Sequence, residues 1–171
     1  MPNIVLIGFS HCGKSTFGKA LAKKLQRPFI DTDKLLLEGT SFSKARNLYQ
    51  KLGEDKFRNL ETEKIKLLAE QDGLVIATGG GTVLKFENHS LLQKNGQLIY
   101  LATPAKILWQ RIKKHGIPAY LSANTNPYQA FLQVYAERES IYQALANDIV
   151  ATQQKTYSQI LTELIALARA I

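Results

Sequence analysis

The sequence contains a single cysteine, Cys12, so a disulfide framework within the chain is excluded and a reducing compartment is favoured. Glycine and proline contribute only 11 and 5 residues, too few for a fibrous or disordered chain. No apolar run approaches the roughly 20 residues that a membrane-spanning helix needs, and the N-terminus carries no basic leader. We therefore expect a folded cytoplasmic protein without an export signal or a membrane segment.

Positive charge is in excess. The 22 Lys and Arg residues outnumber 14 acidic residues, which gives a net charge of +8 with His neutral. This balance favours anionic partners such as nucleotides, nucleic acid or lipid headgroups, without choosing among them. Because the chain has no motif of interleaved aromatic and basic residues, we expect no nucleic-acid partner. Its 171 residues are enough for one domain, and we expect that domain to span residues 1–171 as a monomer.

Short apolar runs rich in β-branched residues alternate with segments of helical periodicity. Such runs are typical of strands buried on both faces, and they occur at residues 4–7, 28–30, 74–77, 98–101 and 149–151. The alternation predicts an α/β fold in which a parallel sheet lies between helices, with ligands beyond the carboxyl ends of the strands. Two further segments look separate from the core: a substrate-binding helical excursion at about 34–60 and a lid at about 113–127.

The first strand leads into a phosphate-binding motif. Residues 8–16 read Gly-Phe-Ser-His-Cys-Gly-Lys-Ser-Thr, which fits G-x-x-x-x-G-K-[ST] between a buried strand and a helix. In this context backbone N–H groups converge with the positive end of the helix and can hold a polyphosphate, with Lys14 on the outer phosphates and Ser15 on magnesium. A plain glycine-rich turn is the alternative.

Two residues of this loop are unusual. His11 occupies a place where such loops often carry glycine, and we expect it to adopt a left-handed backbone conformation with a structural role. Crowding of the phosphates is the other possibility for this residue. Cys12 is expected to be a small loop residue, although a helix N-terminus can lower the pKa of a thiol.

Two carboxylates follow the second predicted strand. In Asp31-Thr32-Asp33, strand alternation would point both aspartates the same way, toward the phosphate loop. Phosphoryl transfer needs one carboxylate to hold magnesium and another to orient or deprotonate an acceptor hydroxyl. The alternative is that Asp33 merely caps a helix that starts at Lys34.

Two more segments favour an anionic acceptor. Arg58 and Glu61 lie three apart on a predicted helix, so the glutamate can fix the guanidinium while it grips an anion, or the two can form an ordinary surface ion pair. Gly79, Gly80 and Gly81 follow the third strand, which suggests close approach of a ligand to the backbone or, alternatively, a flexible loop.

The order of these motifs resembles that of the shikimate kinase family. They are the loop that ends in Gly-Lys-Ser-Thr, followed by Asp-Thr-Asp, then Phe-Arg-x-x-Glu and then Thr-Gly-Gly-Gly. Leu-Tyr-Gln-Lys-Leu-Gly-Glu at 48–54 and Arg138 followed by Tyr142 add to the likeness, which runs from residue 4 to about 152. The resemblance implies a P-loop fold related to nucleoside monophosphate kinases, with a five-stranded parallel sheet ordered 2-3-1-4-5. It also implies an ATP-dependent phosphotransferase that phosphorylates the 3-hydroxyl of shikimate in aromatic amino acid biosynthesis.

The resemblance also implies roles for individual residues. Lys14 would stabilise the transferring phosphoryl group, and Asp33 would bind the shikimate hydroxyls and act as the base. Other implied contacts are His11, Cys12, Gly13, Lys14, Ser15, Thr16 and Arg111 for the nucleotide, Ser15 and Asp31 for Mg²⁺, and Arg58, Gly79, Gly80, Gly81 and Arg138 for shikimate.

One segment departs from the family pattern. The lid usually reads Arg-Pro-Leu-Leu, with the arginine reaching over the phosphates, whereas this chain has Ile117 followed by Pro-Ala-Tyr-Leu. Lys113 or Lys114 could replace the missing cation, or both could be solvated helix-end lysines. Two alternatives to a shikimate kinase therefore stay open: another small P-loop kinase for a sugar acid or nucleotide, and a nucleotide-binding homologue with weakened catalysis.

Overall fold

The predicted apolar runs form the strands of a parallel sheet. The computed structural model describes residues 1–170, and its strands are β1 (Asn3–Ile7), β2 (Phe29–Asp31), β3 (Val75–Ala77), β4 (Gly96–Ala102) and β5 (Asp148–Ala151). Their order is β2-β3-β1-β4-β5 and every neighbouring pair is parallel. The predicted fold class and strand order are thus confirmed. β1 is the central strand and is buried over its whole length, as its continuous apolar sequence indicates.

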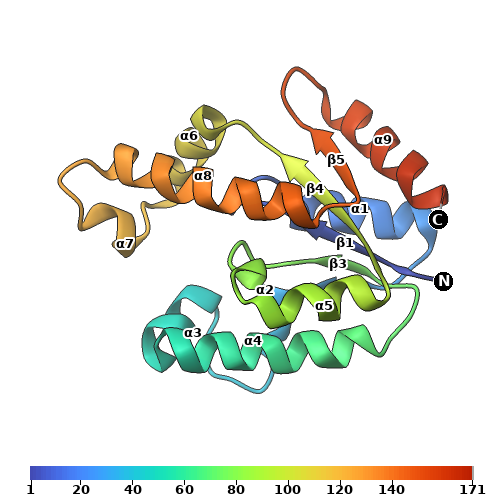
Figure 1. Cartoon of the computed structure of the whole chain (residues 1–171), viewed down its shortest axis with the longest axis horizontal. Coiled ribbons are helices and arrows are strands. Elements are labelled where there is room, and N and C mark those ends of the chain that lie inside the picture. Colours follow the sequence, from blue (N-terminus) through green and yellow to red (C-terminus); the bar gives the residue numbers. More distant parts are fainter. Residues whose placement is uncertain (171) are drawn as a thin grey trace.

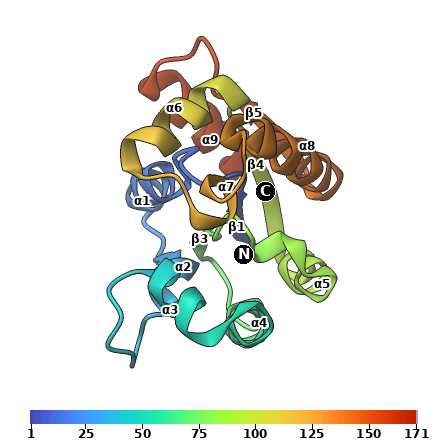
Figure 2. The same cartoon turned by 90° about the vertical axis from the view of Figure 1, so that its left-hand side faces the viewer.

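Helices cover both faces of this sheet (Figures 1 and 2). Helix α1 packs against α9 on one face, while α5 and α8 contact β4 on the other and α4 lies beside α5. Each connection between strands is a helical crossover, as parallel strands require. The described helices are α1 (Lys14–Leu25), α2 (Thr32–Leu35), α3 (Ala45–Leu52), α4 (Glu54–Ala69), a 3₁₀ turn η1 (Thr82–Leu84), α5 (Phe86–Lys94), α6 (Ala105–His115), α7 (Ala119–Ser122), α8 (Pro127–Leu145) and α9 (Tyr157–Arg169).

The segment 34–60 contains the end of α2, helix α3 and the start of α4. Leu36, Leu48 and Phe57 form a small hydrophobic cluster of their own, apart from the main core around the sheet. In Figure 1 this part extends below the sheet, away from α8 and α9. The side chains of the segment therefore pack mainly on one another.

The segment 113–127 joins α6 to α8 through the short helix α7, which lies near the N-terminal end of α8 (Figure 1). Leu121 is buried and Ile117 packs against the core, whereas Tyr120 is 51% exposed. Among residues 1–170, no helix is both long enough and apolar enough to cross a bilayer.

The register of the sheet aligns the carboxyl ends of the first three strands. Leu6 of β1 pairs with Ala77 of β3, and Ala77 pairs with Asp31 of β2. The segments that follow these three strands therefore emerge side by side at one edge of the sheet. This edge carries the motifs that the sequence indicated.

Candidate active site

The loop after β1 is a tight turn that ends in the first residue of α1. Three of its residues have positive φ: Gly8 at 143°, His11 at 66° and Gly13 at 106°. The left-handed conformation expected for His11 is therefore confirmed. Such a turn brings backbone N–H groups toward a common centre in front of the helix, an arrangement that binds anions.

Lys14 folds back onto this loop. Its Nζ donates to the carbonyl oxygens of Gly8 at 2.7 Å and Phe9 at 2.8 Å, and it lies 3.6 Å from the Sγ of Cys12. The lysine is 7% exposed and the cysteine 1% exposed. The ammonium group is thus held at the floor of the loop, where an incoming phosphate can compete with neutral carbonyl groups for its protons.

The two aspartates at the junction of β2 and α2 lie close together, but not for the reason expected. Strand alternation is wrong here, because β2 ends at Asp31 and α2 begins at Thr32. The interpretation of Asp33 as a helix cap is also wrong, since the side chain of Asp31 caps α2 by accepting from the Asp33 N–H at 3.1 Å. The other oxygen of Asp31 accepts from the Ser15 hydroxyl at 2.6 Å. Hence Asp31 connects β2, α1 and α2.

Asp33 lines the site from the first turn of α2. Its side chain is open to the pocket, yet the surrounding protein removes enough water to raise its pKa to about 6. The negative charges of Asp31 and Glu61 also raise this pKa, while Lys14 and Arg58 lower it. A carboxyl group with this pKa can accept a proton near neutral pH more readily than an ordinary aspartate.

The three glycines after β3 make room for side chains of the site. A Cβ on Gly79 would lie 2.5 Å from Asp33 Oδ1, and one on Gly80 would lie 2.6 Å from Ser10 Oγ. A Cβ on Gly81 would lie 2.7 Å from Arg58 Nη1. None of the three has φ in the left-handed range, so close packing rather than backbone freedom accounts for this run.

This glycine loop is held in place by hydrogen bonds. The Thr32 hydroxyl accepts from the Gly79 N–H at 2.8 Å, and the Tyr142 hydroxyl donates to the Gly80 carbonyl at 2.6 Å. The loop therefore joins α2 to α8 at the edge of the sheet.

Arg58 is fixed by a buried carboxylate. It forms an ion pair with Glu61, and Glu61 also accepts from the Thr82 hydroxyl at 2.9 Å. The glutamate side chain is 2% exposed and that of Arg58 is 18% exposed, so this is not an ordinary surface pair. The Nε of Arg58 is buried and lacks a hydrogen-bond partner among the described residues.

Arg138, on α8, lies beside the phosphate loop. Its guanidinium lies 5.2 Å from the ring centre of Phe9, in the phosphate loop. Tyr142, one turn further along α8, is the residue bonded to Gly80. Arg58 of α4 thus lies against Gly81, and Arg138 lies on the same helix as Tyr142, which holds Gly80.

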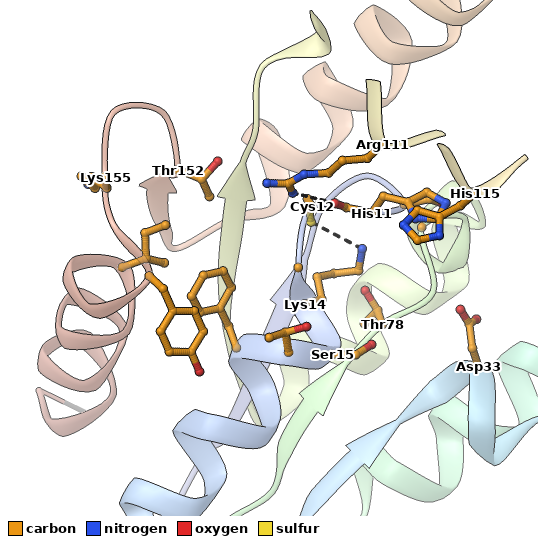
Figure 3. Close-up of a pocket in the computed structure, with 17 residues that line it drawn as sticks. His11, Cys12, Lys14, Ser15, Asp33, Thr78, Arg111, His115, Thr152 and Lys155 are labelled. Atoms are coloured by element: carbon orange, nitrogen blue, oxygen red, sulfur yellow. Dashed lines mark hydrogen bonds between the residues drawn. The ribbon is translucent and has the colours of Figure 1, made fainter. Parts of the chain in front are cut away.

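A pocket of about 770 Å³ lies over the phosphate loop (Figure 3). Asp33 and Gly80 line this pocket. So do the predicted nucleotide-binding residues, which are His11, Cys12, Gly13, Lys14, Ser15, Thr16 and Arg111. Arg111 also donates to the His11 carbonyl at 2.8 Å. The described lining does not include Asp31, Arg58, Gly79, Gly81 or Arg138, which lie around the loops beside the pocket.

Several lining residues were missed at the sequence level. Thr152 and Lys155 follow β5, so the rule that ligands bind beyond strand ends could have found them. Tyr157, the first residue of α9, is 49% exposed and stacks on Phe17 with ring centres 5.0 Å apart. His115, at the end of α6, lies within the segment predicted as a lid, but no motif marked it as a residue of the site. Its ring stacks on His11 at 5.1 Å.

The fold and this site together define a class. A parallel sheet of this order, with a phosphate loop after the central strand and a carboxylate beside it, is the architecture of a P-loop kinase. The chain belongs to the shikimate kinase family, whose model matches residues 10–169. The predicted family and its class of enzyme, an ATP-dependent phosphotransferase with an alcohol acceptor, are thereby confirmed.

Individual relatives support this membership along the whole chain. A shikimate kinase of Sulfurihydrogenibium is 37% identical over 165 residues, with 96% of each chain covered. One from Geobacter sulfurreducens is 35% identical, with 98% of this chain and 91% of the relative covered. The solved structure of a shikimate kinase from Acinetobacter baumannii in complex with shikimate has a TM-score of 0.87 at 30% identity, covering 99% of this chain and 94% of that one.

Other P-loop proteins share only the fold. A gluconokinase from Sinorhizobium meliloti covers 99% of this chain and 93% of its own at a TM-score of 0.63, but it is 21% identical. The comparisons thus favour the shikimate kinase reading over another small kinase.

Proposed function

We propose that this chain transfers the γ-phosphoryl group of ATP to the 3-hydroxyl of shikimate, which gives 3-phosphoshikimate and ADP. The observation that carries the proposal is that Lys14 and Asp33 line one pocket, from α1 and α2. A cation for the transferring phosphoryl group and a carboxylate for the acceptor hydroxyl are the two groups that this reaction needs.

At the nucleotide end, the backbone of residues 11–16 surrounds the phosphates and Lys14 binds the outer ones. To do so, its Nζ leaves the Gly8 and Phe9 carbonyl oxygens and exchanges two neutral acceptors for an anionic one. Arg111 lies against the adenine. Its place in the lining of the same pocket as the phosphate loop supports this assignment.

Ser15 and Asp31 are the residues that would hold Mg²⁺. Their oxygens lie 2.6 Å apart, and a hydroxyl and a carboxylate are donors that this ion prefers. Among the described residues, no group of three or more His, Cys, Asp or Glu side chains forms a metal site, which suits an ion bound mainly by water and substrate phosphates. When bound, Mg²⁺ would neutralise charge on the phosphates.

At the acceptor end, Asp33 orients the 3-hydroxyl and accepts its proton as the oxygen bonds to phosphorus and the bond to ADP breaks. A pKa of about 6 leaves this group mainly ionised at neutral pH. Arg58 and Arg138 bind the shikimate carboxylate, with the backbone of Gly79, Gly80 and Gly81 beside the ring. The partly exposed Arg58 side chain, whose guanidinium lies against Gly81, supports this assignment.

The chain would work as one kinase domain, in which residues 34–60 bind the acceptor and residues 113–127 close over the pocket. The small hydrophobic cluster of the first segment supports its independent movement. We further propose a monomer in the cytoplasm that binds no nucleic acid. The excess of positive charge would then attract the two anionic substrates, ATP and shikimate.

A panel of acceptors in a coupled assay of ADP release tests the proposal. Shikimate should outperform gluconate and nucleoside monophosphates, and Asp33→Asn should abolish shikimate-dependent turnover while ATP still binds. If another acceptor is preferred, the substrate assignment is wrong. Tight ATP binding without turnover of any acceptor would instead indicate a nucleotide-binding homologue that has lost catalysis.

A further inference from the structure

The phosphate loop and helix α6 are joined by a pair of histidines. The rings of His11 and His115 are stacked, with centres 5.1 Å apart and planes 6° from parallel. His115 is the last residue of α6, and Arg111, one turn earlier, donates to the His11 carbonyl. Two contacts therefore attach the end of α6 to the loop, at the point where the segment 113–127 begins.

The pair lies at the phosphate end of the pocket. Both histidines line the pocket together with Lys14. In Figure 3 the two rings lie toward Asp33, whereas Thr152 and Lys155 lie at the opposite end. A group in this position is placed to meet the terminal phosphates rather than the base.

Both histidines stand close to the places where the sequence departs from its family pattern. His11 replaces a frequent glycine, and Ile117, two residues after His115, replaces the lid arginine. Ile117 packs against the hydrophobic core, so its side chain is not directed at the phosphates. Lys113 and Lys114 are exposed, and the described lining of the pocket includes neither of them.

We propose that His115, held by its stack on His11, donates a charged hydrogen bond to the terminal phosphates of the bound nucleotide in place of the missing lid arginine. This inference rests on the proposed function. The stack fixes the ring before the nucleotide arrives, so little side-chain entropy is lost on binding. A protonated imidazole supplies both the donor and the charge that an arginine would supply.

The charges around the pair suit this role. Burial lowers the pKa of His11, and the positive charges of His115, Lys14 and Arg111 lower it further. These positive charges therefore disfavour a proton on His11. Bound polyphosphate would offset the repulsion among the neighbouring cations.

Variants at both histidines test the proposal. His115→Gln should lower kcat about tenfold, the loss of one charge-assisted contact, with the KM for shikimate unchanged. His11→Gly should show the same defect, because it removes the stack while glycine accepts the backbone φ of 66°. His115→Arg should restore turnover. Lys113→Gln and Lys114→Gln are the matched controls on the same helix end, and they should leave kcat within twofold.

The pH profile separates a phosphate contact from a merely structural one. Histidine ordinarily loses its charge between pH 5 and 8, whereas arginine does not. The ratio of wild-type kcat to that of His115→Arg should therefore fall about tenfold as pH rises from 6 to 8.5, and Asp33 contributes equally to both enzymes. A flat ratio would overturn the proposal.

Three further results would also overturn it: wild-type kinetics in His115→Gln, a larger loss in either lysine variant, or tighter ATP binding and faster turnover once the stack is removed. The last would mean that the rings obstruct the pocket. Failure of the proposed function is distinguishable, because wild-type protein would then show no shikimate-dependent turnover at any pH.

Discussion

Glu61 is the buried charge on which the acceptor side of the site depends most. Replacement by alanine leaves the Arg58 guanidinium without its counter-ion and the buried Thr82 hydroxyl without its acceptor. Removing one partner of a buried ion pair costs about 3–5 kcal/mol. Because Arg58 keeps 18% exposure, we take the lower end, about 3 kcal/mol. For a domain of this size that corresponds to a fall in Tm of about 6–12 °C.

Thermal unfolding followed by circular dichroism measures this effect, with Glu70→Ala as the control. Glu70 also pairs with a lysine, Lys94, but these side chains are 71% and 58% exposed, so the change should cost at most about 1 kcal/mol. Glu61→Ala should in addition raise the KM for shikimate while the KM for ATP changes little, since Arg58 loses its orientation. If the two alanine variants unfold within 2 °C of each other, the reasoning about the buried pair is refuted.

Three other changes test separate parts of the site. Activity should rise with pH through about 6 as Asp33 ionises. Asp33→Asn should unfold less readily than wild type at pH 7 but not at pH 3, because a raised carboxyl pKa costs stability only above its unfolded value of 3.8. A difference in stability that does not depend on pH would contradict this. Gly81→Ala should raise the KM for shikimate at least tenfold by displacing the Arg58 guanidinium, and unchanged steady-state kinetics would show that the close approach is unimportant. Tyr142→Phe leaves the Gly80 carbonyl without its donor and should lower the stability to guanidinium by about 1 kcal/mol, which an unchanged midpoint would refute.

Apolar patterning predicted the sheet because its inner strands β1 and β3 are continuous buried runs, although the edge strands β2 and β5 are only partly buried. The phosphate loop was equally predictable, since its spacing and flanking elements leave few alternatives. Even the left-handed backbone of His11 followed from its position in the loop.

The remaining features depend on contacts between distant segments, which no local pattern encodes. Asp31 and Asp33 meet because a strand turns directly into a helix, not through alternation. The glycine run looked like a ligand surface, yet its neighbours include Asp33 and Arg58, from other elements. His115 reaches the site only because α6 packs where its last turn meets the loop. The residues in these contacts come from different elements, so their proximity depends on how the chain folds.

The central claim is that the ends of the first three strands assemble one phosphoryl-transfer site. A crystal structure of the complex with ADP, Mg²⁺ and shikimate tests it most directly. The account predicts the 3-hydroxyl within about 3.2 Å of an Asp33 oxygen and the carboxylate bound by both Arg58 and Arg138. Shikimate bound elsewhere, or Asp33 turned away from the hydroxyl and from Lys14, would contradict it.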